Sequence, residues 1–186
     1  HGLRRAFVWT LTILGFFPLL GALAFLFRLR WFQVALIALS LIPIASYWSV
    51  TPYSVRSHDV SGAGGHIGYV AYIAEHWTLP KPNEGWTYYH PPLYYIGGAL
   101  CWKVANLVGA APSTMLQAFS LALWLIFLTA SASALRYSLR GQAGLLALAT
   151  LLLAFWPSGP IHSIRVGNDI MLYANVGVAV WFLTRW

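Results

Sequence analysis

The sequence predicts an all-α membrane protein, a polytopic bundle of transmembrane helices with interfacial helices in its first external loop. Of the 186 residues, 59% are hydrophobic and only 8% are charged, which is too apolar for a soluble domain. Several apolar runs approach the roughly 20 residues that span a bilayer. Ten Trp, ten Tyr and ten Phe suit a protein whose helix ends lie at two membrane interfaces. A helical bundle also satisfies the backbone hydrogen bonds within lipid.

Six apolar segments are expected to form this bundle. In chain order they cover residues 6–27, 31–50, 91–110, 114–135, 142–157 and 171–184. We divide the chain into an extra N-terminal transmembrane segment at 1–30 and a module at 31–186. The first segment has the basic start, apolar centre and small residues of a signal peptide, but its apolar run is long for one, so a retained helix is favoured.

Arginine clusters predict which segments cross the membrane. The formal net charge is +7, and cytoplasmic loops are commonly rich in Arg and Lys. The clusters that separate or follow apolar segments are Arg28 with Arg30, Arg136 with Arg140, and Arg185. If all of them face the cytoplasm, 91–110 lies in the interface or dips in and returns. The alternative, in which 91–110 crosses, puts Arg136 and Arg140 outside and is disfavoured. No basic run with interleaved aromatics indicates nucleic-acid binding.

This topology collects the chemically capable side chains on the external side, in a first loop at 50–113 and a second at 158–170. All four acidic residues fall there, with five of the six histidines and several cations. These residues are Asp59, Glu75, Glu84, Asp169, His58, His66, His76, His90, His162, Arg56, Lys81, Lys103 and Arg165. External loops are polar in any case, yet the cytoplasmic loops carry almost nothing except Arg, and this asymmetry favours an external site.

The first external loop predicts an interfacial helix and a rigid corner. "HIGYVAYIAEHW", residues 66–77, has helical spacing, with an apolar stripe formed by Ile67, Val70, Ala71 and Ala74. In "YHPPLYY", residues 89–95, the two prolines can occupy a helix start, where a missing N–H group costs little. The corner would present its Tyr and His just outside the next helix.

These elements together resemble the GT-C fold of integral-membrane glycosyltransferases. The likeness is to the branch that contains protein O-mannosyltransferases, the aminoarabinose transferase of lipid A and many bacterial relatives. It rests on Asp59 in the first external loop, on "HPPL" at a juxtamembrane helix, and on "SIRVGNDIMLY" with Asp169 in the second loop. The match covers about 31–186. The chain departs from the family in the extra segment 6–27 and in its short length.

The resemblance implies an inverting transfer of a sugar from a polyprenyl phosphate to an acceptor hydroxyl, at the external face of a bacterial inner membrane. A carboxylate must accept the hydroxyl proton, and a cation must stabilise the leaving phosphate. The catalytic candidates are Asp59, as the base, and Asp169. Candidates for donor phosphate binding are Arg165, Arg56 and Lys103, and those for substrate binding are His90, Tyr89 and Asn168.

Structural roles for the same residues stay open. Asp59 and Asp169 could cap helices, Arg165 could hold a lipid phosphate, and Lys103 could extend to the interface. No cofactor is required, although Asp59, His90 and Glu84 could bind a divalent metal. The single Cys101 excludes an internal disulfide and a cysteine metal cluster.

A second class of function is a non-catalytic structural subunit of a larger membrane complex, built on part of the same fold. The chain starts with His and stops inside an apolar stretch, so we expect it to be a piece of a longer protein. The expected partners are a polyprenyl-phosphate-linked sugar and membrane lipids for the enzyme, with other membrane subunits for the structural alternative.

Overall fold

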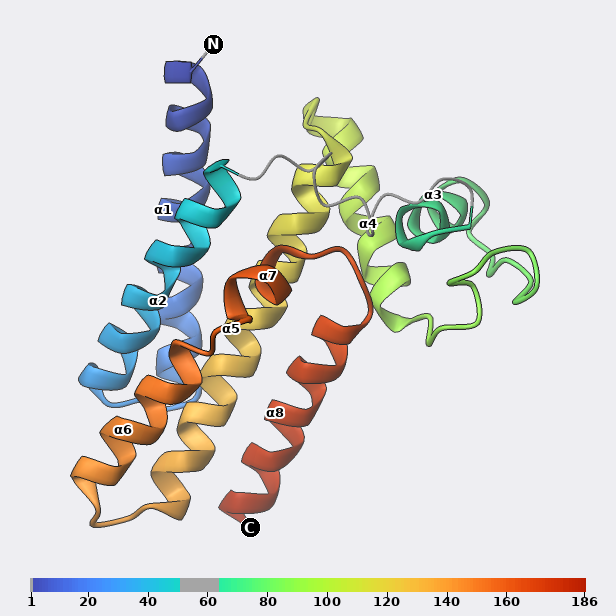
Figure 1. The fold of residues 1–186 in the computed structure, drawn as a ribbon. Coiled ribbons are helices and arrows are strands. Elements are labelled where there is room, and N and C mark those ends of the chain that lie inside the picture. The colour runs from blue at the N-terminus through green and yellow to red at the C-terminus, as the bar shows by residue number, and fades with distance from the viewer. Residues whose placement is uncertain (1, 51–63) are drawn as a thin grey trace.

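The computed structural model describes residues 2–50 and 64–186, with side chains from residue 14 onward. Within these ranges every regular element is a helix, so the all-α class is confirmed (Figure 1). The helices are α1 (Gly2–Leu26), α2 (Trp31–Val50), α3 (His66–His76), α4 (Leu93–Val108), α5 (Pro112–Ser138), α6 (Ala143–Ala154), α7 (Gly159–Ile164) and α8 (Asp169–Arg185).

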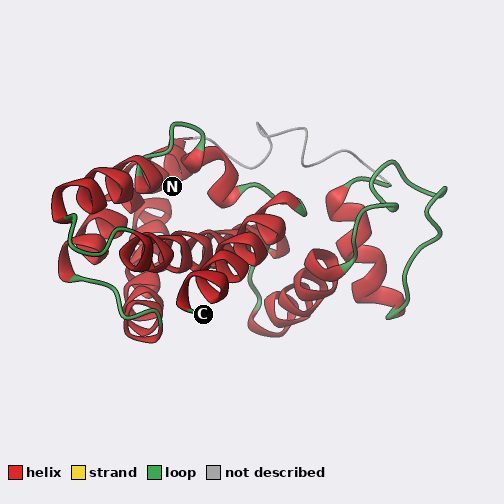
Figure 2. Cartoon of the chain, turned by 90° about the horizontal axis from the view of Figure 1, so that it is seen from below, coloured by secondary structure: helices red, strands yellow, loops and turns green. Residues whose placement is uncertain are grey.

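Helix α5 is the centre of the bundle. It packs most extensively against α8 and also contacts α1, α4, α6 and α7. Its buried side chains lie on several faces, as expected for a helix surrounded by others. Gly177 allows α8 to approach closely, because a Cβ atom there would lie 3.1 Å from the Phe127 carbonyl oxygen and from Ser131 Oγ. Seen from below, α3 and the loop after it lie to one side of this bundle (Figure 2).

Two of the described helices are long and apolar enough to cross a membrane. They are α2, with 20 residues, and α5, with 27, which correspond to the predicted segments 31–50 and 114–135. Helix α8 has 17 residues and covers the predicted segment 171–184.

The predicted continuous segment 142–157 was wrong in its extent. Helix α6 has 12 residues and ends at Ala154, so it rises only about 18 Å, less than the roughly 30 Å of a bilayer core. Pro157 explains the break, because a proline disfavours helical geometry at the residue before it. The chain turns at 155–158 and continues as the short helix α7.

The helix predicted over 66–77 is present as α3, but its buried face is rotated from the predicted stripe. The buried residues are His66, Tyr69, Val70, Ile73 and Ala74, whereas Ile67 and Ala71 lie half-buried at the margin. The predicted stripe left out Ile73 and the rings of His66 and Tyr69. Both rings take part in a buried contact with α4.

Helix α4 begins directly after the two prolines, as predicted. Pro92 is its N-cap residue, and the Pro92 carbonyl accepts a 2.9 Å hydrogen bond from the Ile96 N–H. The helix runs alongside the first part of α5 and does not extend to the end of the bundle where α5 turns into α6 (Figure 1).

The arginine clusters meet at that end, which we call the arginine end (Arg28, Arg30, Arg136, Arg140 and Arg185). The Arg136 guanidinium donates a hydrogen bond to the Arg28 carbonyl. The Arg140 and Arg185 guanidinium carbons lie 5.3 Å and 5.9 Å from the centre of the Tyr137 ring. The α1–α2 turn, the α5–α6 turn and the C-terminus therefore share one end of the structure (Figure 1).

Candidate functional site

A hydrogen-bonded group of three side chains lies where α3, α4 and the corner before α4 meet. We call it the histidine–tyrosine centre (His66, His90 and Tyr95). His66 Nδ1 lies 2.7 Å from Tyr95 Oη, and His90 Nδ1 lies 3.2 Å from the same oxygen. Tyr95 is completely buried and His66 is 6% exposed, while His90 is half-buried. One phenolic hydroxyl therefore joins two imidazoles from different elements.

The loop before α4 is fixed to the start of α3, and this brings His90 to His66. The Gly64 carbonyl accepts hydrogen bonds from the Thr87 N–H and the Thr87 hydroxyl, both at 3.0 Å. The Thr87 carbonyl in turn accepts one from the His90 N–H at 3.0 Å. Gly64 has φ of 97°, a conformation that favours glycine. A Cβ atom on Gly64 would also lie only 2.8 Å from Gly85 Cα, so this close approach requires glycine.

Aromatic stacking holds the rings of the centre in place. The Tyr69 and Tyr95 rings are stacked with centroids 4.0 Å apart. The His66 ring is stacked on His90 at 5.5 Å and meets Trp86 edge-on at 5.5 Å. Such ring pairs each contribute about 0.5–1.5 kcal/mol beyond the area that they bury. The orientation of the two imidazoles is therefore determined by packing as well as by hydrogen bonds.

The link between α7 and α8 closes the centre from the other side. A Cβ atom at Gly167 would lie 3.7 Å from both Cε1 and Nε2 of His66, so this link passes directly over the imidazole. Asp169 follows as the first residue of α8. Burial raises the pKa of Tyr95 above its ordinary value, and the charge of Asp169 adds to that rise. The second predicted loop thus meets the predicted corner.

The structure brings some of the predicted site residues together and separates others. Arg165 ends α7 and is half-buried, two residues before Gly167. Asn168 is the N-cap residue of α8 and does not use its side chain as a cap. Tyr89 is exposed and meets His90 edge-on at 4.5 Å. Lys103 is exposed ten residues into α4. The predicted Asp59 and Arg56 lie outside the described residues.

The two described members of the predicted metal site, His90 and Glu84, each contact a different side chain. Glu84 is exposed and pairs with Lys81 at 3.4 Å, and His90 Nδ1 contacts Tyr95. Among the described residues there is no group of three side chains that could hold a metal ion. The third member of the predicted set, Asp59, lies outside these residues.

Sequence reasoning missed two members of the centre, His66 and Tyr95. The sequence pattern places His66 on the helix over 66–77 and Tyr95 in "YHPPLYY" without indicating that the two side chains meet. Tyr95 lies in the first turn of α4, three residues after its N-cap. This short separation from the corner was the sequence feature that could have indicated a contact between the Tyr95 hydroxyl and His90.

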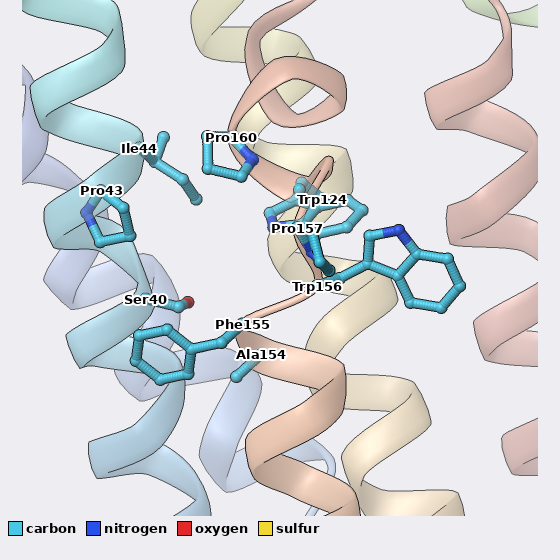
Figure 3. Close-up of a pocket in the computed structure, with 10 residues that line it drawn as sticks. Ser40, Pro43, Ile44, Trp124, Ala154, Phe155, Trp156, Pro157 and Pro160 are labelled. Carbon is cyan, nitrogen blue, oxygen red and sulfur yellow. The ribbon is translucent and has the colours of Figure 1, made fainter.

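A cavity away from the histidine–tyrosine centre lies between α2, α5 and the α6–α7 break (Figure 3). This cavity of about 210 Å³ is mostly apolar, and Pro43 and Ile44 of α2 face Pro157 and Pro160 across it. The Ser40 hydroxyl also lies on its wall. The fully enclosed Trp124 indole N–H has no hydrogen-bond acceptor among the described residues.

Comparison with protein-family models, with curated proteins and with solved structures finds no match for this chain.

Proposed function

We propose that the chain is the core of a polytopic membrane glycosyltransferase that moves a sugar from a polyprenyl phosphate to an acceptor hydroxyl. The observation that carries this proposal is the meeting of two distant motifs. The "HPPL" corner and the "RVGND" link, which form the basis of the GT-C resemblance, lie on opposite sides of His66. A polar, partly enclosed centre is thereby formed away from the arginine end (Figure 1).

The distribution of charge supports a membrane setting with this centre on the external side. The described acids Glu75, Glu84 and Asp169 lie on α3, on the loop after it and at the start of α8. The arginines at the other end have no carboxylate partner among the described ion pairs. An arginine-rich end with few acids is typical of a cytoplasmic face.

Helix α4 supports the same arrangement through its outer face. It carries exposed apolar residues at helical spacing, namely Leu93, Ile96, Leu100, Val104 and Leu107. A continuous apolar stripe of this kind suits contact with lipid. Because α4 runs beside the first part of α5 and does not reach the arginine end (Figure 1), it would lie in the external half of the membrane without crossing it.

The chemistry required by the transfer fits the residues around the centre. The leaving phosphate is an anion, and a guanidinium can bind two of its oxygens. We assign this role to Arg165, next to the link over His66. The acceptor hydroxyl must lose a proton to a base within hydrogen-bonding reach. The apolar cavity of Figure 3 has α7 as one wall, and we assign the donor's isoprenoid chain to it.

Donor binding tests the proposal. The full chain in lipid nanodiscs is titrated with a polyprenyl phosphate, and binding is read by native mass spectrometry. The Arg165→Ala protein should bind at least about tenfold more weakly, the equivalent of about 1.4 kcal/mol, because a charge-assisted contact is lost. The matched control is Arg140→Ala, which removes the same group at the arginine end and should leave affinity unchanged.

Two results would contradict the proposal. The first is a chain that binds no polyprenyl phosphate, which would favour the structural-subunit alternative. The second is equal weakening by both substitutions, which would show that binding reflects overall positive charge.

A further inference from the structure

We propose that His90, Tyr95 and His66 form a proton relay, in which His90 takes a proton at the rim of the site and His66 releases one beneath the α7–α8 link. The inference rests on the proposed function, because it supplies a path for the proton that the acceptor hydroxyl loses. It goes further by assigning a direction and a chemical state to each of the three groups.

The two distances indicate which atom donates in each hydrogen bond. An O–H donor lies most often about 2.7–2.8 Å from its acceptor, whereas an N–H donor lies most often about 2.9–3.0 Å away. The shorter contact, 2.7 Å, joins Tyr95 Oη to His66 Nδ1. The longer contact, 3.2 Å, joins His90 Nδ1 to Tyr95 Oη. We therefore assign the Tyr95 hydroxyl as the donor to His66 and as the acceptor from the His90 N–H.

This assignment fixes opposite tautomers on the two histidines. A neutral imidazole has one N–H and one lone pair. Because His90 carries its proton on Nδ1, its Nε2 is the lone pair that can accept a proton. Because His66 accepts at Nδ1, its proton is on Nε2. The Tyr95 hydroxyl carries one hydrogen and can therefore donate to only one of the two imidazoles.

The exposure of the three groups indicates where a proton enters the relay and where it leaves. His90 is half-buried at the corner, where a substrate can reach it. Tyr95 is fully buried in the middle, so bulk water cannot replace it. His66 Nε2 lies on the edge of the ring that the α7–α8 link covers, and Asp169 stands two residues beyond Gly167 in that link.

The step is balanced in atoms and charge. The acceptor hydroxyl gives its proton to His90 Nε2 as its oxygen forms the bond to the anomeric carbon, and the bond from that carbon to the phosphate oxygen breaks, so that polyprenyl phosphate leaves. The His90 Nδ1 proton passes to Tyr95 Oη, the Tyr95 proton passes to His66 Nδ1, and His66 releases its Nε2 proton to water. Tyr95 stays neutral at both ends of the step, which agrees with the raised pKa that burial gives it.

The groups around the relay would also stabilise an imidazolium that forms during proton transfer. Asp169 acts on Tyr95 from α8, and Tyr69, Tyr89 and Tyr94 surround it from α3, the corner and α4. Arg165 precedes the link. A carboxylate beside the path stabilises an imidazolium. Tyr95 and His66 act through His90 and are therefore positioning residues.

Nitrogen NMR of the full chain labelled with ¹⁵N-histidine tests the relay without substrate. The expected result is an Nδ1–H tautomer for His90 and an Nε2–H tautomer for His66, each identified by loss of its signal in a His→Gln variant. Tyr95→Phe keeps the ring stacked on Tyr69 and removes only the hydroxyl. In that variant His90 should change to the Nε2–H tautomer. An Nε2–H tautomer of His90 in the unmodified protein would overturn the proposal.

Tyr94→Phe is the matched control. It removes the neighbouring hydroxyl, which contacts Ser120 Oγ at 2.9 Å on the other face of α4, and should leave both tautomers unchanged. Turnover then separates the relay from the transfer itself. Tyr95→Phe should lower kcat at least about tenfold with unchanged affinity for polyprenyl phosphate, and Tyr94→Phe should not. A normal kcat for Tyr95→Phe would overturn the relay, whereas absent donor binding by the unmodified chain would overturn the transfer function and leave the tautomer result standing.

Discussion

Two regions of the molecule hold their polar groups in different ways. At the arginine end, guanidinium groups contact a backbone carbonyl and aromatic faces. Around the histidine–tyrosine centre, polar side chains contact one another through hydrogen bonds of defined geometry. The charges of the arginine end are anchored to the scaffold. The groups of the histidine–tyrosine centre are joined to one another, as the proposed relay requires.

This difference separates a scaffold role from a chemical role. Substitutions at the arginine end should change stability or membrane orientation, and leave the activity of each folded molecule intact. Substitutions around the centre should change activity, and leave the fold intact. The following predictions test this division, from the largest expected effect to the smallest.

The largest effect is expected from Asp169→Asn. The substitution keeps the size of the side chain at the start of α8 and removes its charge from the centre. Turnover in an active preparation should fall by about two to three powers of ten, the usual weight of one group that stabilises charge during a reaction. Stability should fall by only about 0.3–1 kcal/mol, the value of an acid at a helix N-terminus. Single-turnover kinetics and thermal unfolding measure the two effects.

Glu75→Gln is the control for Asp169→Asn. It removes an exposed acid from α3 and should leave turnover unchanged. A similar loss in both variants would show that the overall negative charge of the external side matters and the position of Asp169 does not.

The second effect concerns a buried amide at the arginine end. Gln33 is fully buried and donates to the Ala132 carbonyl at 2.7 Å, while its Oε1 accepts from the Arg30 N–H at 3.1 Å. Gln33→Leu should destabilise the protein by about 2–3 kcal/mol, because a buried carbonyl loses its donor. Donor affinity of the folded protein should not change. Gln142→Leu, an exposed change near the same end, should leave stability unchanged. A loss of donor affinity in folded Gln33→Leu protein would contradict the separation of scaffold and chemical roles.

A third, smaller effect is expected on the exposed apolar stripe of α4. Leu100→Lys places a charge on an exposed apolar face, which should cost about 1–2 kcal/mol in a bilayer. The cost should be smaller in detergent, where water reaches the ammonium group more easily. Thermal unfolding in nanodiscs and in detergent gives the difference. Leu79→Lys, in the exposed loop after α3, should show no difference between the two media. An equal loss of stability for Leu100→Lys in nanodiscs and in detergent would place α4 outside lipid.

The smallest effect is expected from Glu84→Gln. The Lys81–Glu84 pair is solvent-exposed, and such pairs contribute less than about 1 kcal/mol. Activity should be unchanged, with or without a chelator. A loss of activity that added divalent cation restores would return Glu84 to the metal site considered from the sequence.

The all-helical class and the positions of most helices could be predicted from the sequence, because apolar run length and proline positions are local properties. The helix start after Pro92 is one example. The break after Ala154 was missed although Pro157 was visible, because the apolar run continues through Phe155 and Trp156. Hydropathy alone does not separate a helix from an apolar turn.

The histidine–tyrosine centre could be predicted only in part. His90 was singled out because it adjoins two prolines. His66 could not be paired with it, since the pairing depends on contacts of Thr87 and Gly64 that join the loop to α3. Tertiary hydrogen bonds of this kind leave no periodic pattern in the sequence. Asp169 was found through the family resemblance, and its proximity to Tyr95 came from the fold.

Cysteine labelling tests the central claim, that the arginine end lies on the cytoplasmic side of a membrane and the histidine–tyrosine centre on the external side. On a Cys101→Ala background, Asn83→Cys marks the loop of the external side and Ser138→Cys marks the arginine end; both positions are exposed. Intact cells receive a membrane-impermeant maleimide, with permeabilised cells as the control for reactivity. The account predicts that the Asn83→Cys protein is labelled in intact cells and that the Ser138→Cys protein is labelled only after permeabilisation. Equal labelling of both proteins in intact cells would contradict it.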